Sequence, residues 1–284
     1  MPQLPSNPFF TSRSDRVELA RQSYLPRLKP GNFIKIPSLF VSYGAPAFAV
    51  EQGQAGPLLQ GIGQRVLEMP GLRAVLVISP HWRARGLCVG VSERPPTVRD
   101  FGGFPAELYA LNYPADGASD VALEVAKVLA QSGLAAQQVD DQGLDHGAWV
   151  PLLHMLLGAP LRILQLSLPI EFRAADALTL GRALAPLREK CIFAMGSGSL
   201  THNLCEFRQT KLEEPEVYVS EFVQWSRSAA MVHDEMALVE FRGTPHSQRA
   251  HPSDEHYLPL LVAAGCWLLA PVLPVSLLRS SKAV

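Results

Sequence analysis

Cysteine is scarce in this sequence, and its four cysteines show no spacing typical of a metal or redox site. None of Cys88, Cys191, Cys205 and Cys266 belongs to a C-x-x-C pair, which disfavours a zinc ribbon or a disulfide oxidoreductase. Three of them lie in apolar runs, as is typical of buried free thiols in a reducing compartment. We therefore expect free cysteines with no role in the chemistry.

An excess of charge of either sign is also missing. The formal net charge is −1, and lysine and arginine are spread along the chain without a basic stripe or an acidic tail. This pattern disfavours a nucleic-acid-binding protein or one that binds a strongly cationic partner. We expect no nucleic acid among the partners, and a homo-oligomer is compatible with the sequence.

Long apolar segments are absent as well. The longest apolar run, near residues 258–278, is interrupted by three prolines and a glycine, so it predicts a core helix and a strand rather than a membrane span. The first 35 residues are polar, with several arginines and no apolar centre, which excludes a secretory signal. These features predict a soluble cytoplasmic protein without a membrane partner.

What the sequence does contain is a repeated alternation of strand-like and helix-like segments. Hydrophobic residues make up 48% of the 284 residues, enough for a sizeable core. We expect strands at 36–44, 73–82, 86–92, 161–168 and 191–200, and helices at 58–69, 119–133, 172–190, 215–241 and 254–267. Ser119 and Ser253 are predicted to cap two of these helices, and Gly133 to end one.

This alternation predicts an α/β fold, with a central and mainly parallel sheet flanked by helices. No linker or composition shift divides the chain, so we expect one catalytic domain at residues 35–284. It would follow an N-terminal extension, residues 1–34, with a short helix near 14–23. Ligands of such folds bind beyond the carboxyl ends of the strands, where Tyr43, His81 and His202 are expected.

Histidine provides the main candidates for chemistry, because imidazole binds iron and zinc and transfers protons near neutral pH. Four of the eight histidines have settings typical of structural or surface residues: His154, His233, His246 and His251. The other four lie at the ends of predicted elements, where their side chains can converge: His81, His146, His202 and His256. Their spacing matches no compact metal motif, so the signal comes from the four contexts together.

Those contexts resemble the class III extradiol ring-cleaving dioxygenases, in the branch similar to DOPA 4,5-dioxygenase. The matching blocks are SPHW (79–82), RDFGGFPAELYALNYPADG (99–117), GLDHGAW (143–149), GSGSLTHNL (196–204) and HPSDEHYLPLLVAAG (251–265). They occur in the order of the family and extend over about residues 37–267.

The resemblance implies an enzyme that opens a catechol-type ring beside its two hydroxyl groups with dioxygen. It also implies one non-haem metal ion, Fe(II) for catalysis or zinc. His81 and His256 correspond to metal ligands of the family. His202 corresponds to a histidine near the metal and is a candidate both as a ligand and as a catalytic residue. His146 corresponds to a residue that transfers protons and positions the substrate. Asp100, Phe104, Tyr109 and Tyr113 belong to the block expected to line the substrate loop.

Tyr43 departs from the family, which has a ligand histidine at this strand end. In one interpretation His81, His202 and His256 bind the metal, Tyr43 lines the substrate pocket and ring cleavage is retained. In a second, Tyr43 is itself a ligand and the reaction differs, since a phenolate favours Fe(III) over Fe(II). In a third, the chain is a non-catalytic homologue that acts as a binding or partner subunit. We favour the first, because ordinary loss of function would have eroded the other histidines too.

Overall fold

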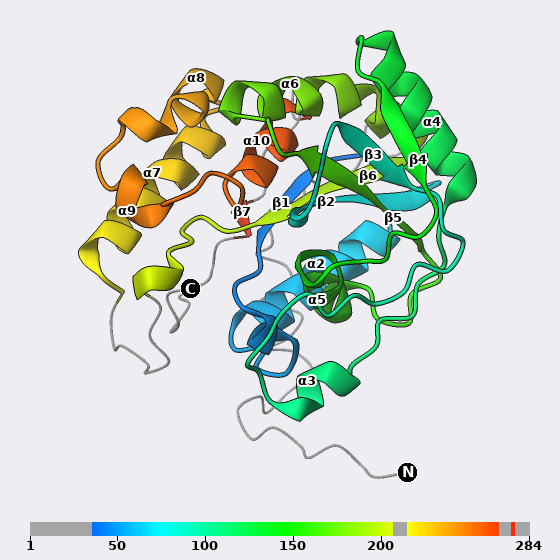
Figure 1. Ribbon diagram of the computed structural model, residues 1–284, viewed down its shortest axis with the longest axis horizontal. Coiled ribbons are helices and arrows are strands. Elements are labelled where there is room, and N and C mark those ends of the chain that lie inside the picture. Colours follow the sequence, from blue (N-terminus) through cyan, green and yellow to red (C-terminus); the bar gives the residue numbers. More distant parts are fainter. Residues whose placement is uncertain (1–35, 207–214, 267–273, 276–284) are drawn as a thin grey trace.

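One seven-stranded sheet runs through the part of the protein that the computed structural model describes, residues 36–206, 215–266 and 274–275 (Figure 1). The predicted extension at residues 1–34 and its helix lie outside these residues. The strands are β1 (Leu39–Ser42), β2 (Ala74–Ala84), β3 (Leu87–Gly90), β4 (Ala136–Val139), β5 (Arg162–Pro169), β6 (Ile192–Gly198) and β7 (Pro274–Val275). Their order across the sheet is β4-β3-β5-β2-β6-β1-β7.

The sheet is mainly parallel, as the sequence predicts. Its neighbouring strands pair in parallel except where β3 meets β5. The central strands β2, β5 and β6 are buried along most of their length, which accounts for their continuous apolar sequences. Strand β4 was not predicted, because its sequence AQQV is polar and half-exposed at the sheet edge.

Helices cover both faces of the sheet (Figure 1). The α-helices are α2 (Ala55–Leu67), α3 (Ala106–Ala110), α4 (Ser119–Gln131), α5 (His146–Met155), α6 (Ala174–Leu184), α7 (Val217–Met231), α8 (Glu235–Val239), α9 (Ser247–Ala250) and α10 (Leu258–Gly265). Short 3₁₀ helices are η1 (Pro46–Ala49), η2 (Ala185–Lys190), η3 (Leu204–Glu206) and η4 (Phe241–Gly243). One hydrophobic cluster joins the sheet to α4, α6, α7 and α10, and a second joins it to α2 and α5. No helix of the described segments is both long and apolar enough to cross a membrane.

Some predicted helix boundaries are wrong. Ser119 is the first residue of α4 and forms no cap, whereas Gly133 follows the helix with φ +77°, as expected of a helix end. Ser253 does not cap α10 either, since its hydroxyl donates to Glu255 Oε1 at 2.9 Å. The predicted helix at 215–241 is divided, because Asp234 accepts a hydrogen bond from Ala237 N and begins α8. The predicted helix at 172–190 likewise divides into α6 and η2.

Two local features of the sheet determine where His81 and His256 lie. Strand β2 is irregular between Ile78 and Arg83, a stretch that pairs with only Leu166 to Leu168 of β5. It contains Pro80, which cannot donate a ladder hydrogen bond, so the strand bulges where His81 lies. In β6, a Cβ atom on Gly198 would lie 2.4 Å from His256 O, so this glycine lets the segment before α10 approach the strand.

Candidate active site

Three predicted site residues lie at the edge of the sheet that is formed by the carboxyl ends of its parallel strands. Strands β2, β6 and β1 are adjacent and parallel, so their carboxyl ends meet there. Tyr43 directly follows β1, His81 lies near the end of β2, and His202 follows β6. The loop of His202 is held by a hydrogen bond from His202 N to Ala250 O, 2.7 Å long.

His256 joins this edge from the segment that leads into α10. A hydrogen bond of 2.9 Å from Ser199 N to His256 O ties this segment to the end of β6. The His202 and His256 rings then stack, with centroids 3.4 Å apart and planes 9° from parallel. The His256 ring also meets the His81 ring edge-on at 5.1 Å. The three histidines that the resemblance places at or near a metal therefore lie together.

His146 completes the cluster from the first turn of α5. Asp145 caps this helix by accepting a hydrogen bond from Ala148 N, which places His146 at the helix start beneath the sheet edge. The His146 ring lies 3.9 Å from the His81 ring, measured between centroids. Its exposure is only 5%, so the surrounding residues hold the ring in place.

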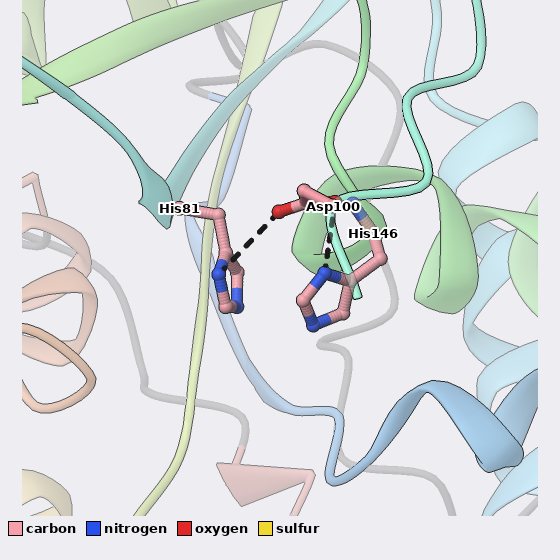
Figure 2. A group of neighbouring side chains, drawn as sticks. All are labelled: His81, Asp100 and His146. Carbon is pink, nitrogen blue, oxygen red and sulfur yellow. Dashed lines mark hydrogen bonds and ion pairs between the residues drawn. The ribbon is translucent and has the colours of Figure 1, made fainter. Parts of the chain in front are cut away.

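Asp100 lies between His81 and His146 (Figure 2). Its Oδ1 is 2.9 Å from His146 Nδ1, and its Oδ2 is 3.5 Å from His81 Nδ1. His146 N also donates to Asp100 Oδ1 at 2.9 Å. The sequence predicts a place in the substrate loop for Asp100, and the structure adds a contact with two histidines of the cluster.

Three of the histidines have a carboxylate oxygen beside their Nδ1 atom. His256 Nδ1 lies 3.2 Å from Glu255 Oε1, which matches the arrangement of His81 and His146 with Asp100. A carboxylate partner favours the proton on Nδ1 and leaves the Nε2 lone pair available. Histidines that bind metals are oriented in this way by a hydrogen bond at the other ring nitrogen. The donor set therefore fits a divalent metal such as iron or zinc.

The protonation of the cluster also fits metal binding, since a ligand imidazole must be neutral. Burial lowers the pKa of His81 to about 3, helped by the nearby His146 and His256. Burial likewise lowers the pKa of His202 to about 4, and lowers that of His256 against the opposing effect of Glu255. Burial resists ionisation of Asp100, but the hydrogen bonds with His146 and the charges of His146 and His81 together outweigh it and lower the pKa of this carboxyl. Neutral imidazoles beside ionised carboxylates follow at neutral pH.

Tyr43 contacts the cluster through its hydroxyl, which lies 2.5 Å from His81 Nε2. Burial raises the pKa of Tyr43 well above its usual value, and the charges of Asp145 and Asp100 raise it further. The phenol is thus protonated and donates its hydrogen bond to His81. This bond occupies the lone pair that His81 would offer to a metal.

Asp145 supports the cluster, a role that its sequence context does not predict. Its Oδ1 accepts from Ser79 Oγ at 2.7 Å, and its Oδ2 accepts from Gln165 Nε2. It thereby joins β2, β5 and α5 below His81 and His146. Burial raises the pKa of Asp145 to about 6 even though both hydrogen bonds oppose the shift. Gly147 is required beside it, because a Cβ atom there would lie 2.3 Å from Ser79 Oγ.

The aromatic loop meets the cluster through Phe101, which was also missed. Its ring lies 5.6 Å from that of His146, 5.4 Å from Phe104 and 5.2 Å from Tyr109. Phe101 belongs to the DFGGFP block, so the signal was present in the sequence. Tyr113 is only 3% exposed and packs in the cluster with α2 and α5. A substrate contact of Phe104, Tyr109 or Tyr113 stays a prediction.

Two metal-sized groups of donor atoms occur among the described residues. The first contains His81, Asp100 and His146, and the second contains His202, Glu255 and His256. Within each group the donor atoms lie within 4.8 Å of one another. The predicted ligands His81, His202 and His256 are drawn from both groups, so the division between ligands and proton-transfer residues stays a prediction.

The remaining histidines lie apart from the cluster. His154 is half-buried, with Nε2 at 2.8 Å from Phe48 O. His251 is fully buried, with Nε2 at 2.9 Å from Leu200 O. His246 pairs with Glu221 at 2.9 Å, and His233 is exposed at the end of α7. They have the structural and surface positions expected of them.

Comparison with known proteins shows which family the chain resembles. The family model described as the catalytic LigB subunit of aromatic ring-opening dioxygenase matches residues 36–270. A protein of Escherichia coli (strain K12) named 4,5-DOPA dioxygenase extradiol is 32% identical over 236 residues, which cover 82% of this chain and 86% of that protein. A Beta vulgaris protein of the same name is 33% identical over 231 residues, covering 80% and 85%.

A solved structure has the same fold. The crystal structure of an uncharacterized protein from Escherichia coli K12 superimposes with a TM-score of 0.67 at 28% sequence identity, covering 82% of this chain and 89% of that one. The family model extends over most of the sequence, and the histidines of the matching blocks gather at one edge of the sheet. The chain therefore belongs to the class III extradiol dioxygenase family, which includes the catalytic LigB subunit of aromatic ring-opening dioxygenases.

Proposed function

We propose that this protein is a metal-dependent extradiol dioxygenase that opens a catechol-type aromatic ring. The observation that carries the proposal is the set of clustered histidines whose Nδ1 atoms face carboxylates, which orients the Nε2 lone pairs for a metal. A non-catalytic role is not favoured, because the matched family and the named relatives are dioxygenases.

His81, His202 and His256 hold the metal in this proposal, and Fe(II) is the ion that suits the reaction. Bound Fe(II) would supply the redox chemistry with dioxygen and would acidify the diol. Zinc, the alternative ion, fits the same nitrogen donors but supplies no redox chemistry.

His146 accepts a proton from the diol at Nε2, while Asp100 stabilises the resulting imidazolium through Nδ1. The ionised carboxylate is suited to this role because its two histidine contacts fix its position. Phe101 lies against the His146 ring and provides an apolar surface for the aromatic substrate. Phe104, Tyr109 and Tyr113 extend this surface, and Tyr43 faces the substrate beside His81.

Metal analysis and an activity assay together test the proposal. Protein purified without added metal is analysed for iron and zinc, then loaded with Fe(II) without dioxygen and mixed with catechols in air. We expect near-stoichiometric iron and a yellow ring-opened product. Protein loaded with zinc should bind the metal but form no product. Failure to bind iron, or a loaded protein that opens no catechol, would contradict the proposal.

A further inference from the structure

His251 has no role in the chemistry described so far, although it lies where the segments of two cluster histidines meet. The first segment follows β6 and contains Leu200 and His202. The second leads into α10 and contains His251 and His256. The positions of His202 and His256 therefore depend on how these two segments lie against each other.

Backbone hydrogen bonds join the two segments at both ends of their contact. At one end His202 N donates to Ala250 O at 2.7 Å, and at the other Ser199 N donates to His256 O at 2.9 Å. Both bonds use main-chain atoms, so they form whatever side chain occupies position 251. Between them, the contact depends on the His251 ring.

The ring of His251 donates a hydrogen bond across this contact. Its Nε2 lies 2.9 Å from Leu200 O, and a carbonyl oxygen can only accept, so Nε2 carries the proton. Burial lowers the pKa of His251 to about 3, which keeps the ring neutral. Nδ1 is then the unprotonated nitrogen, and it is buried with no partner among the described residues. Because a buried polar atom without a partner is costly, the bond at Nε2 must offset this cost.

Neighbouring side chains fix the direction of this bond. The centroid of the His251 ring lies 5.3 Å from that of Tyr257, 5.6 Å from Phe222 and 6.2 Å from Phe241. Arg242 donates to the carbonyl oxygen of the same residue, so the backbone is held as well. The donor at Nε2 therefore has a fixed position against the first segment.

The first segment needs such a contact, because residues 200–203 belong to no helix or strand. Leu200, which accepts the bond, lies two residues before His202. The His202 and His256 rings stack with centroids 3.4 Å apart and planes 9° from parallel. At this separation, a small movement of the segment changes the distance between the two rings.

We infer that His251 is a positioning residue, whose hydrogen bond to Leu200 O holds His202 and His256 at the spacing with which they bind one metal ion. The metal in this statement rests on the proposed function. The positioning itself rests on the hydrogen bond and on the contact between the two segments.

Nuclear magnetic resonance of metal-free protein with labelled histidine side chains tests the positioning. In the wild type, we expect His251 to carry its proton on Nε2. His251→Leu removes the donor and should shift the ring signals of His202 and His256, which respond to a stacked neighbour. His251→Gln keeps an N–H group near the position of Nε2, so it should restore most of both signals.

His154→Leu is the matched control. His154 Nε2 also lies 2.8 Å from a backbone carbonyl, that of Phe48, but it is apart from the cluster. This substitution should leave the His202 and His256 signals unchanged. If His251→Leu fails to fold, His251→Asn takes its place, because its shorter side chain ends near the position of Nδ1.

Zinc affinity measures the consequence for the site, since zinc binds nitrogen donors without redox chemistry. It is determined by competition with a chelator, under conditions in which urea unfolding shows each variant to be fully folded. We expect His251→Leu to bind zinc at least about tenfold more weakly, as is typical when a residue that orients ligands is lost. His251→Gln should recover most of the affinity, and His154→Leu should keep all of it.

A purely structural His251 would lower the stability of the protein and leave the folded site as it is. Unchanged ring signals or unchanged zinc affinity in folded His251→Leu would therefore overturn the inference, as would equal effects of His154→Leu or a proton on Nδ1 of His251.

The same samples separate this inference from the proposed function. If zinc affinity depends on His251 as expected but the Fe(II)-loaded protein opens no catechol, the ring-opening proposal fails and the positioning role stands. If catechols are opened while His251→Leu keeps its ring signals and zinc affinity, the enzyme stands and the positioning role fails. A wild type that binds neither zinc nor iron would overturn both.

Discussion

At the scale of single residues, Tyr43 has the largest consequence for the chemistry. Its phenol is buried and protonated, and it donates to the nitrogen through which His81 would bind a metal. A metal at His81 must therefore displace this hydrogen bond. The hydroxyl is a competitor in this geometry, whereas a deprotonated phenolate would be a ligand.

Replacing Tyr43 distinguishes the two roles. Tyr43→Phe removes the competing hydroxyl and should tighten Fe(II) binding modestly. Tyr43→His also adds a donor and should tighten it at least tenfold, about 1.4 kcal/mol, with faster ring opening. The measurement is Fe(II) affinity by competition with a chelator. Weaker binding in Tyr43→Phe would show that the tyrosine is a ligand. A wild type that cleaves catechols well but loses activity in Tyr43→His would show that the tyrosine is adapted to its own substrate.

His146 is expected to transfer protons rather than to bind the metal. His146→Ala should leave the iron content nearly unchanged and lower turnover about 100-fold or more, since general base catalysis is lost. His81→Ala is the comparison and should lose most of its iron. Iron content by elemental analysis and turnover are measured on the same samples. Loss of iron in His146→Ala would make it a ligand, within the group formed by His81, Asp100 and His146.

At the scale of elements, glycine allows α6 and α10 to pack closely over the sheet. A Cβ atom on Gly181 would lie 2.2 Å from Val262 O, and one on Gly265 would lie 2.3 Å from Leu178 O. The two helices thus touch backbone to backbone. Because His256 lies two residues before the start of α10, this packing also determines where His256 lies relative to His202.

Gly181→Ala should therefore destabilise the protein even though alanine favours helices. We expect a loss of about 1–3 kcal/mol in the free energy of unfolding, because the helices must move apart. Gly61→Ala is the control: Gly61 lies within α2, and a Cβ atom there would meet nothing within 4 Å. It should stabilise the protein by about 0.5–1 kcal/mol. Urea unfolding measures both, and equal effects of the two substitutions would refute the packing argument.

At the scale of the whole molecule, the buried histidines link folding to pH. His81, His202 and His251 have pKa values of about 3, 4 and 3 in the folded protein, mainly because of burial. Unfolding returns them to about 6.5. The unfolded chain therefore binds more protons than the folded one between these values, and stability falls as the pH drops below about 6.5. Asp145 opposes this trend, since its pKa is raised to about 6.

Metal-free protein should consequently unfold at a lower urea concentration at pH 5 than at pH 7.5. Three histidines act in one direction and one aspartate in the other, so the histidines dominate. His202→Gln should reduce the dependence on pH, because one of the histidines is removed. Urea midpoints for both proteins at both pH values provide the check. A midpoint that rises on acidification would mean that the histidines are charged in the folded state.

Much of the fold followed from local patterns in the sequence. Apolar runs such as RAVLVISPHW identify buried strands whatever their neighbours are, and the alternation with helices implies a parallel sheet. The helix caps were less predictable, since Ser253 donates to Glu255 instead of capping α10. The sequence also identified the four histidines of the cluster, because each lies at the end of an element in a distinctive motif.

The sequence by itself thus determined the α/β class, the family and the residues that can do chemistry. Only the tertiary structure decided which of these side chains contact one another. The contact of Asp100 with His146 joins residues 46 apart, that of Ser79 with Asp145 residues 66 apart, and that of Tyr43 with His81 residues 38 apart. Periodicity reports which way a side chain faces within one element. The distance between two elements depends on packing across the sheet. The protonation of the histidines and the competition at His81 depend on the same packing.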